Sequence, residues 1–238
     1  MSGRPAVFLD KDGTLLDDLP FNVAPERMRL APGVADGLAV LAGLGVPLIV
    51  VSNQPGVAWG YFPVAALAGV RARLARLFAA AGARLTDFLY CPHAPVDAAG
   101  GAGLATAAPA AAPARPAASA RSGRGLACVC RKPAPGMFYS AAARHAIDLS
   151  ASWMIGDILD DVEAGRRAGC RTILIDRGGE TEWHWSALRR PDLVVPDFAA
   201  AAHSVALLTP RGLLSAPQQQ AGARPLPDVQ RPPAARAP

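Results

Sequence analysis

Short apolar runs alternate along the chain with stretches in which apolar residues recur at helical spacing. Residues 6–9 and 47–51 form continuous apolar runs that end abruptly in polar residues, a pattern typical of buried strands. Between them, residues 34–44 repeat apolar side chains every three or four positions, as a helix packed on a core does. The alternation predicts a parallel sheet whose strands are joined by helices.

The same alternation extends to about residue 195. Residues 63–81 form a longer helical pattern that leaves Arg71, Arg73 and Arg76 on its exposed side. The remaining patterns predict strands at 85–90, 152–155, 171–175 and 192–195 and helices at 136–145 and 160–168. We therefore expect an α/β fold, a Rossmann-like three-layer sandwich with a central parallel sheet. We expect no large cap domain, because no long structured insertion follows the first or the third strand.

Two segments lack the large apolar side chains that a core needs. Residues 97–125 consist mostly of Ala, Pro and Gly, and residues 209–238 combine a Gln run with repeated Pro. Such segments bury too little apolar surface to offset the entropy that is lost on ordering. The sequence therefore predicts one folded domain over residues 1–208, interrupted by a flexible insertion at 97–125 and followed by a disordered tail at 209–238.

The formal net charge of +5 is concentrated in these two segments. Residues 97–125 carry +2 and residues 211–238 carry +3, so the rest of the chain is neutral. The predicted domain therefore lacks the basic face that is typical of nucleic-acid binding. No apolar run approaches the roughly 18 residues of a membrane span, and no signal-peptide pattern precedes the first strand. We expect a cytoplasmic monomer with reduced cysteines and with neither a nucleic-acid nor a membrane partner.

Polar residues follow the predicted strands at the edge of the sheet where ligands bind. In open α/β sheets the ligand crevice lies outside the carboxyl ends of the strands. Asp10 and Asp12 follow the first strand, and Asp157 follows the strand at 152–155. Further candidates are Ser52, Asn53 and Gln54 after the second strand, and Arg131 and Lys132 ahead of a helix.

These residue types suit phosphoryl transfer through a covalent intermediate. One carboxylate can attack phosphorus, while a second protonates the leaving oxygen and later activates water. Magnesium suits a site of carboxylates, a backbone carbonyl and water, and Lys132 and Ser52 would bind the transferred group. A lone Asp-x-Asp-Gly segment is more often a polar turn after a strand. Four strand-end matches in order favour the catalytic interpretation.

The sequence resembles the haloacid dehalogenase-like phosphohydrolases in four features taken together. These are Asp-Lys-Asp-Gly-Thr at 10–14, Ser52, Lys132 and Gly-Asp-Ile-Leu-Asp-Asp at 156–161. The resemblance covers roughly residues 6–176. It implies that Asp10 is the nucleophile and Asp12 the general acid and base. It also implies that Asp10, the carbonyl of Asp12 and Asp157 bind Mg²⁺, whereas Asp161 supports the site.

A second group of residues has the composition of a metal site. Cys91-Pro-His93 follows a strand, and Cys128-Val-Cys130 runs directly into Arg131 and Lys132. Three thiolates and one imidazole form a closed tetrahedral set, which predicts a small loop that binds structural zinc. Zinc would fix the basic pair against the phosphate. The lone Cys170 is predicted to be a small buried residue, and His145 to lie on a helix surface or at a cap.

Four further motifs extend the resemblance to the heptose bisphosphate phosphatases and their sister group, the histidinol phosphatases. The motifs are Ser-Asn-Gln-Pro-Gly, Cys-x-His, Cys-x-Cys-Arg-Lys-Pro and Pro-Gly-Met. The first group implies hydrolysis of the C7 phosphate of D-glycero-D-manno-heptose 1,7-bisphosphate through an aspartyl-phosphate. The partner is then a small-molecule sugar phosphate.

Other functions stay open at this point. The chain could be a phosphatase of histidinol phosphate or of another small phosphomonoester, or a non-catalytic, zinc-stabilised binding module. Arg131 could contact the substrate or lie in a solvated loop. Two positions depart from the family pattern, because Trp59 and Ile158 stand where a cation is usual.

Overall fold

The computed structural model describes residues 3–95, 128–181 and 183–209. The insertion predicted at 97–125 lies outside the described residues, as do residues 210–238 of the predicted tail. Thr209, with which the tail was predicted to begin, is buried and directly follows the last helix.

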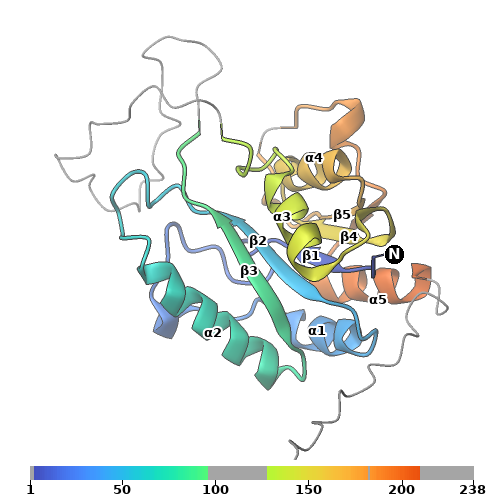
Figure 1. Cartoon of the computed structure of the whole chain (residues 1–238). Coiled ribbons are helices and arrows are strands. Elements are labelled where there is room, and N and C mark those ends of the chain that lie inside the picture. Colours follow the sequence, from blue (N-terminus) through green and yellow to red (C-terminus); the bar gives the residue numbers. More distant parts are fainter. Residues whose placement is uncertain (1–2, 96–127, 182, 210–238) are drawn as a thin grey trace, which may run out of the picture.

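The centre of the molecule is one sheet of six parallel strands in the order β3-β2-β1-β4-β5-β6 (Figure 1). Its strands are β1 (Val7–Leu9), β2 (Leu48–Asn53), β3 (Leu85–Cys91), β4 (Trp153–Gly156), β5 (Arg171–Ile175) and β6 (Leu193–Val195). Every predicted strand is present, with bounds that shift by one or two residues. Strands β2 and β3 are added on one side of β1, and β4, β5 and β6 are added on the other side. This reversal of strand order opens a crevice beyond the carboxyl ends of β1 and β4.

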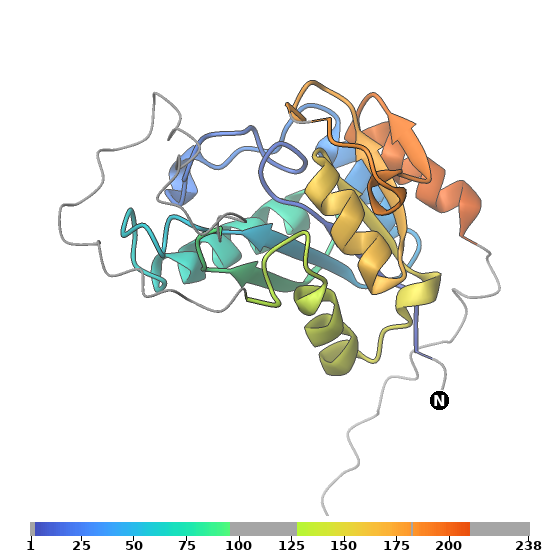
Figure 2. The same ribbon diagram turned by 90° about the horizontal axis from the view of Figure 1, so that it is seen from above.

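Helices cover both faces of the sheet, and Figure 2 shows the resulting layers. One face carries α1 (Val34–Ala42), α2 (Ala66–Ala80) and α5 (Phe198–Leu208), and the other carries α3 (Gly136–His145) and α4 (Leu159–Ala168). Three short 3₁₀ helices, Pro25–Arg27, Leu149–Ala151 and Ala187–Arg189, lie in connections. The layers confirm the predicted α/β sandwich.

Alternation along the strands divides the core into two parts. Val7 and Leu9 of β1 pack under α1, α2 and α5, whereas Phe8 between them packs on Phe138 of α3. Trp153 of β4 lies in the first part and is 2% exposed. Its indole Nε1 donates a hydrogen bond to Thr209 Oγ1 at 3.3 Å, and this bond ties the end of α5 to the sheet.

Helix α5 was not predicted from the sequence. It contains a run of four alanines, and alanine is a weak signal for a core helix. Gly37 of α1 lets the two helices approach closely, because a Cβ there would lie 2.5 Å from the Phe198 ring of α5. Within the described ranges, the longest helix, α2, is too short and too polar to cross a membrane.

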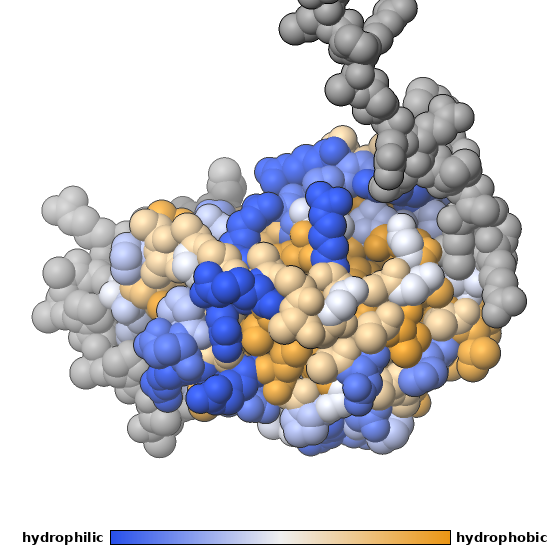
Figure 3. Space-filling model, turned by 90° about the horizontal axis from the view of Figure 1, so that it is seen from below, coloured by the Kyte–Doolittle hydropathy of each residue, from blue (hydrophilic) through white to orange (hydrophobic). Residues whose placement is uncertain are grey.

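A buried carboxylate joins both helical layers to the edge strand β3. Asp87 accepts a hydrogen bond from its neighbour Phe88 N at 2.8 Å and pairs with Arg71 of α2 at 3.0 Å. His145 ends α3, as a helix-surface residue, and its Nε2 lies 3.0 Å from Asp87 Oδ2. Figure 3 views the molecule from below, where hydrophilic and hydrophobic residues lie side by side on the surface.

Candidate active site

Three buried carboxylates meet beyond the carboxyl ends of β1 and β4. Asp10 directly follows β1, and its backbone N–H donates to Ile155 O of β4 at 3.0 Å. Asp157 directly follows β4, and Asp161 lies in the first turn of α4. One oxygen of each carboxylate lies within 4.8 Å of the others. The strand ends therefore concentrate negative charge at the crevice.

Lys132 neutralises part of this charge. Its buried ammonium forms ion pairs with Asp10 and, at 2.5 Å, with Asp161, and it donates to Val51 O at 3.1 Å. Burial disfavours the ammonium, yet the two carboxylates outweigh burial and hold the pKa of Lys132 above its usual range. The lysine, predicted to bind the transferred phosphoryl group, is therefore a fixed cation beside these carboxylates.

The segment that carries Lys132 is attached to the end of β2. Asn53 Oδ1 accepts a hydrogen bond from Lys132 N at 3.0 Å, and Asn53 Nδ2 donates to Lys132 O at 3.1 Å. This reciprocal pair uses both ends of the Asn53 amide. Asn53, predicted as a substrate-binding residue, thus holds the backbone of Lys132 in place.

Asp12 lies at the open side of the carboxylate group. Its side chain is 32% exposed, and Lys11 Nζ lies 3.0 Å from its Oδ2. Gln54 Nε2 donates to Asp12 Oδ2 at 3.3 Å and to Ser52 Oγ at 2.8 Å. Burial raises the pKa of Asp12, although the nearby Lys11 ammonium opposes the rise. Such a carboxyl group can hold a proton for a leaving oxygen.

Thr14 and Gly13 fix Asp157 against the loop that follows β1. Thr14 Oγ1 donates to Asp157 Oδ1 at 2.9 Å. Gly13 has φ +79°, and a Cβ there would lie 2.2 Å from Asp157 Oδ2. Burial and the charge of Asp10 raise the pKa of Asp157 to about 7. Burial also raises the pKa of Asp161.

Crowded oxygen donors of this kind fit a hard divalent cation. Carboxylates held this close repel one another, and a bound dication favours their ionised forms. Asp10 and Asp157, two of the predicted Mg²⁺ ligands, belong to the group, and Asp161 is its third member. The Asp12 side chain lies outside it, in keeping with the prediction that Asp12 would use its carbonyl.

The four predicted zinc ligands also come together. Cys91 Sγ lies 3.5 Å from Cys128 Sγ and 3.2 Å from Cys130 Sγ. His93 Nδ1 lies 3.4 Å from Cys91 Sγ and 3.3 Å from Cys130 Sγ. Sulfur and nitrogen atoms this close match the donor set of a tetrahedral structural zinc site. Cys170 is buried elsewhere, as predicted.

Arg131 lies between the Cys/His group and a cavity. Its Nη1 donates to His93 O at 3.4 Å. Together with Asp160 and Arg167 it lines a cavity of about 370 Å³ beside Lys132. The predicted substrate contact is therefore on a cavity wall next to the buried lysine.

Sequence reasoning missed residues that brace the site from a distance. Arg177, just after β5, donates from Nη2 to Gly13 O at 2.7 Å. Glu180 Oε2 accepts from Leu159 N, the first residue of α4, at 2.7 Å. These contacts join segments far apart in sequence, and no spacing pattern indicates them. The position of residues 178–183 directly after a predicted strand was a local signal, but the sequence favoured a plain surface loop there.

Comparisons with known proteins agree with this geometry. Residues 129–201 match a family model described as HAD-hydrolase-like. A D-glycero-D-manno-heptose-1,7-bisphosphate 7-phosphatase of Thermosynechococcus vestitus is 33% identical over 213 residues, covering 87% of this chain and 99% of the relative. The D-glycero-beta-D-manno-heptose-1,7-bisphosphate 7-phosphatase of Pseudomonas aeruginosa is 29% identical over 203 residues, covering 85% and 98%.

A solved structure extends the likeness to three dimensions. The crystal structure of D,D-heptose 1,7-bisphosphate phosphatase from Bordetella bronchiseptica, complexed with magnesium and phosphate, is 26% identical, with a TM-score of 0.62. The match covers 84% of this chain and 97% of that one.

Proposed function

Because the chain belongs to the haloacid dehalogenase-like hydrolases, in the group of the heptose bisphosphate phosphatases, we propose that it removes the C7 phosphate from D-glycero-D-manno-heptose 1,7-bisphosphate. This membership confirms the family and the class of hydrolase that the sequence predicts. The observation that carries the substrate proposal is the match over 99% of the T. vestitus relative.

The reaction proceeds in two steps at the carboxylate group. Asp10 attacks phosphorus and forms an aspartyl-phosphate, while Asp12 gives its proton to the leaving sugar oxygen. Asp12 then takes a proton from water, the water oxygen attacks phosphorus, and the bond to Asp10 breaks. Asp12 suits both steps because it is partly exposed and lies beside Gln54 and Ser52.

The cations of the site balance the charge of the phosphoryl group. Lys132 already contacts Asp10, so it lies where the transferred group is bound. Mg²⁺, held by Asp10, the Asp12 carbonyl and Asp157, would supply further positive charge during transfer. Ser52, Gln54 and Arg131 complete the proposed substrate contacts, and Asn53 keeps Lys132 in register.

Zinc has a positional role in this proposal. Cys91, His93, Cys128 and Cys130 would hold it, which ties the end of β3 to the segment that carries Lys132. A cytoplasmic location and a monomeric state stay predictions.

The covalent mechanism is tested with Asp10→Asn. The amide cannot attack phosphorus, so we expect kcat on the heptose bisphosphate to fall by at least about a thousandfold. Asp36→Asn, an exposed substitution on α1, is the matched control and should keep full activity. Acid-quenched wild-type enzyme should carry a hydroxylamine-sensitive phosphoryl group that Asp10→Asn lacks. Turnover by Asp10→Asn at the wild-type rate would refute the mechanism.

The substrate is tested separately by comparing kcat/KM on the heptose bisphosphate and on histidinol phosphate. We expect a clear preference for the bisphosphate. Faster hydrolysis of histidinol phosphate would assign the chain to the alternative that the sequence left open.

A further inference from the structure

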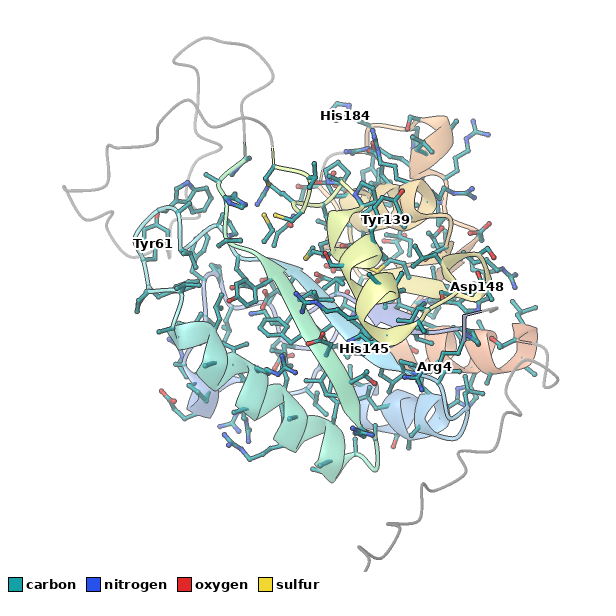
Figure 4. The ribbon with its side chains drawn as sticks, in the orientation of Figure 1. Arg4, Tyr61, Tyr139, His145, Asp148 and His184 are labelled. Atoms are coloured by element: carbon teal, nitrogen blue, oxygen red, sulfur yellow. The ribbon has the colours of Figure 1, made fainter. Side chains whose placement is uncertain are left out.

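Two loops that flank Asp12 meet through three aromatic rings. Phe21 lies 5.4 Å from Trp59 and 4.9 Å from Tyr61 between ring centroids, and Trp59 lies 5.9 Å from Tyr61. We call these three residues the aromatic wall. Figure 4 shows Tyr61 on the loop that extends beyond the carboxyl end of β2.

Both loops of the wall start at the catalytic carboxylates. The loop that carries Phe21 is closed at its base by bridges from Leu16 to Asp12 and to Leu30. The loop that carries Trp59 and Tyr61 begins at Gln54, whose amide contacts Asp12. Both loops of the wall therefore begin next to Asp12, the proposed general acid.

The loop behind Trp59 is held in a fixed shape. Trp59 N donates to Pro55 O at 3.0 Å, and Tyr61 N donates to Gly56 O at 2.8 Å. A Cβ at Gly56 would lie 2.4 Å from the Phe62 ring, so the loop packs tightly on its own side chains. Binding to such a surface costs little ordering entropy.

Phe21 is kept in an unfavourable backbone conformation. Its φ is +55°, in the left-handed region that costs a bulky residue about 1 kcal/mol or more. Phe21 and Tyr61 pack against the larger core, and Trp59 rests on both rings while remaining partly exposed. The two inner rings thus support the indole, which leaves part of Trp59 available to a ligand.

The wall has no charge of its own. Residues 19–25 and 54–62 contain no Lys, Arg, Asp or Glu. These two segments offer a phosphate no cation, whereas the C–H face of a sugar ring packs well on an indole. Resting on the proposed function, we infer that the aromatic wall binds the ring of the leaving group and selects cyclic sugar phosphates over substrates that lack a ring, with Trp59 making the contact.

The inference is tested with Trp59→Ala and Trp59→Phe on two substrates. Heptose bisphosphate has a ring that reaches the wall, and acetyl phosphate is too small to do so. We expect Trp59→Ala to raise KM for the heptose bisphosphate about tenfold, with kcat changed less than about twofold. Activity on acetyl phosphate should not change, and Trp59→Phe should restore most of the KM.

Trp185→Ala is the matched control, since Trp185 is 53% exposed on the loop between β5 and β6. It should leave both substrates unaffected. Equal losses of Trp59→Ala on both substrates, or an unchanged KM for the sugar, would overturn the inference. A wild-type enzyme that hydrolyses neither substrate would instead refute the proposed function, so the two failures are distinguishable.

Discussion

Gly13 shows how a single hydrogen atom in place of a side chain can shape an active site. Its φ of +79° is strained for other residues, and a Cβ would overlap Asp157 Oδ2 at 2.2 Å. We predict that Gly13→Ala displaces Asp157 and lowers kcat/KM by about a hundredfold or more, because small misplacements of reacting groups are costly. Steady-state kinetics at saturating Mg²⁺ measures the loss.

Gly82→Ala separates the effect of backbone strain from the effect of overlap with Asp157. Gly82 has a similar φ of +71°, but a Cβ there meets no atom within 4 Å. This variant should lose about 1 kcal/mol of stability through backbone strain and keep full activity. Similar activity losses in both variants would contradict the role given to the Asp157 contact.

The residues of the candidate site were predictable to different degrees. Asp10 and Asp157 directly follow β1 and β4, and Ser52 lies near the end of β2, so the strand pattern alone brings them to one edge of the sheet. The pairing of Lys132 with Asp161 depends on how α4 packs, which no local pattern encodes. The clamp that Asn53 forms on the Lys132 backbone is equally invisible in sequence, since 79 positions separate the two residues.

Among the elements, β3 depends on a carboxylate that faces helices of both layers. We predict that Asp87→Asn lowers the free energy of unfolding, because it removes the charge that pairs with Arg71 and Arg144. The loss should be only about 1–2 kcal/mol, because both guanidiniums are half-exposed and are screened by solvent. Urea unfolding at pH 6 measures the difference. Asp36→Asn on α1 serves as the exposed control and should change stability by less than about 0.5 kcal/mol.

The same variant has a pH signature. Burial would raise the pKa of Asp87, but its hydrogen bonds to His145 and Phe88 N and the charge of Arg71 hold the pKa below the usual value. A carboxylate with a lowered folded pKa stabilises above its unfolded pKa of about 3.9, and this stabilisation is lost as pH falls through the folded pKa. The difference between wild type and Asp87→Asn should be present at about pH 5 and shrink toward pH 3. A constant difference across that range would contradict the assignment.

Apolar periodicity predicted every strand and every α-helix of the described residues except α5. The six strands and helices α1 to α4 were predicted because large apolar residues mark their buried sides. Helix α5 buries only two large apolar residues, Phe198 and Val205, beside Ala201 and Ala202, and its packing depends on close approach to Gly37 of α1. Close approach is a property of two elements together, so one segment read alone cannot reveal it.

At the scale of the whole molecule, both candidate sites lie at the carboxyl ends of the strands. Asp10 and Asp157 follow β1 and β4, and the Cys/His group begins at Cys91, the last residue of β3. We predict about one equivalent of zinc by elemental analysis. Its removal with a chelator should lower activity strongly while the far-ultraviolet circular dichroism stays unchanged.

Readdition of zinc, but not of Mg²⁺ alone, should restore the activity. Activity should fall because loss of zinc removes one restraint on the segment that carries Lys132. The two hydrogen bonds from Asn53 to the Lys132 backbone would remain. Full activity of protein shown to be free of zinc would rule out the positional role.

The burial of Trp153 also gives the molecule an optical reporter. Of its four tryptophans, Trp153 is enclosed beneath α5, whereas Trp183 and Trp185 are 43% and 53% exposed. A quencher dissolved in the solvent therefore reaches Trp183, Trp185 and the partly exposed Trp59 before it reaches Trp153. The unquenched fluorescence of Trp153 would decrease when the hydrogen bond to Thr209 opens. Fluorescence quenching could therefore follow the docking of α5 on β4.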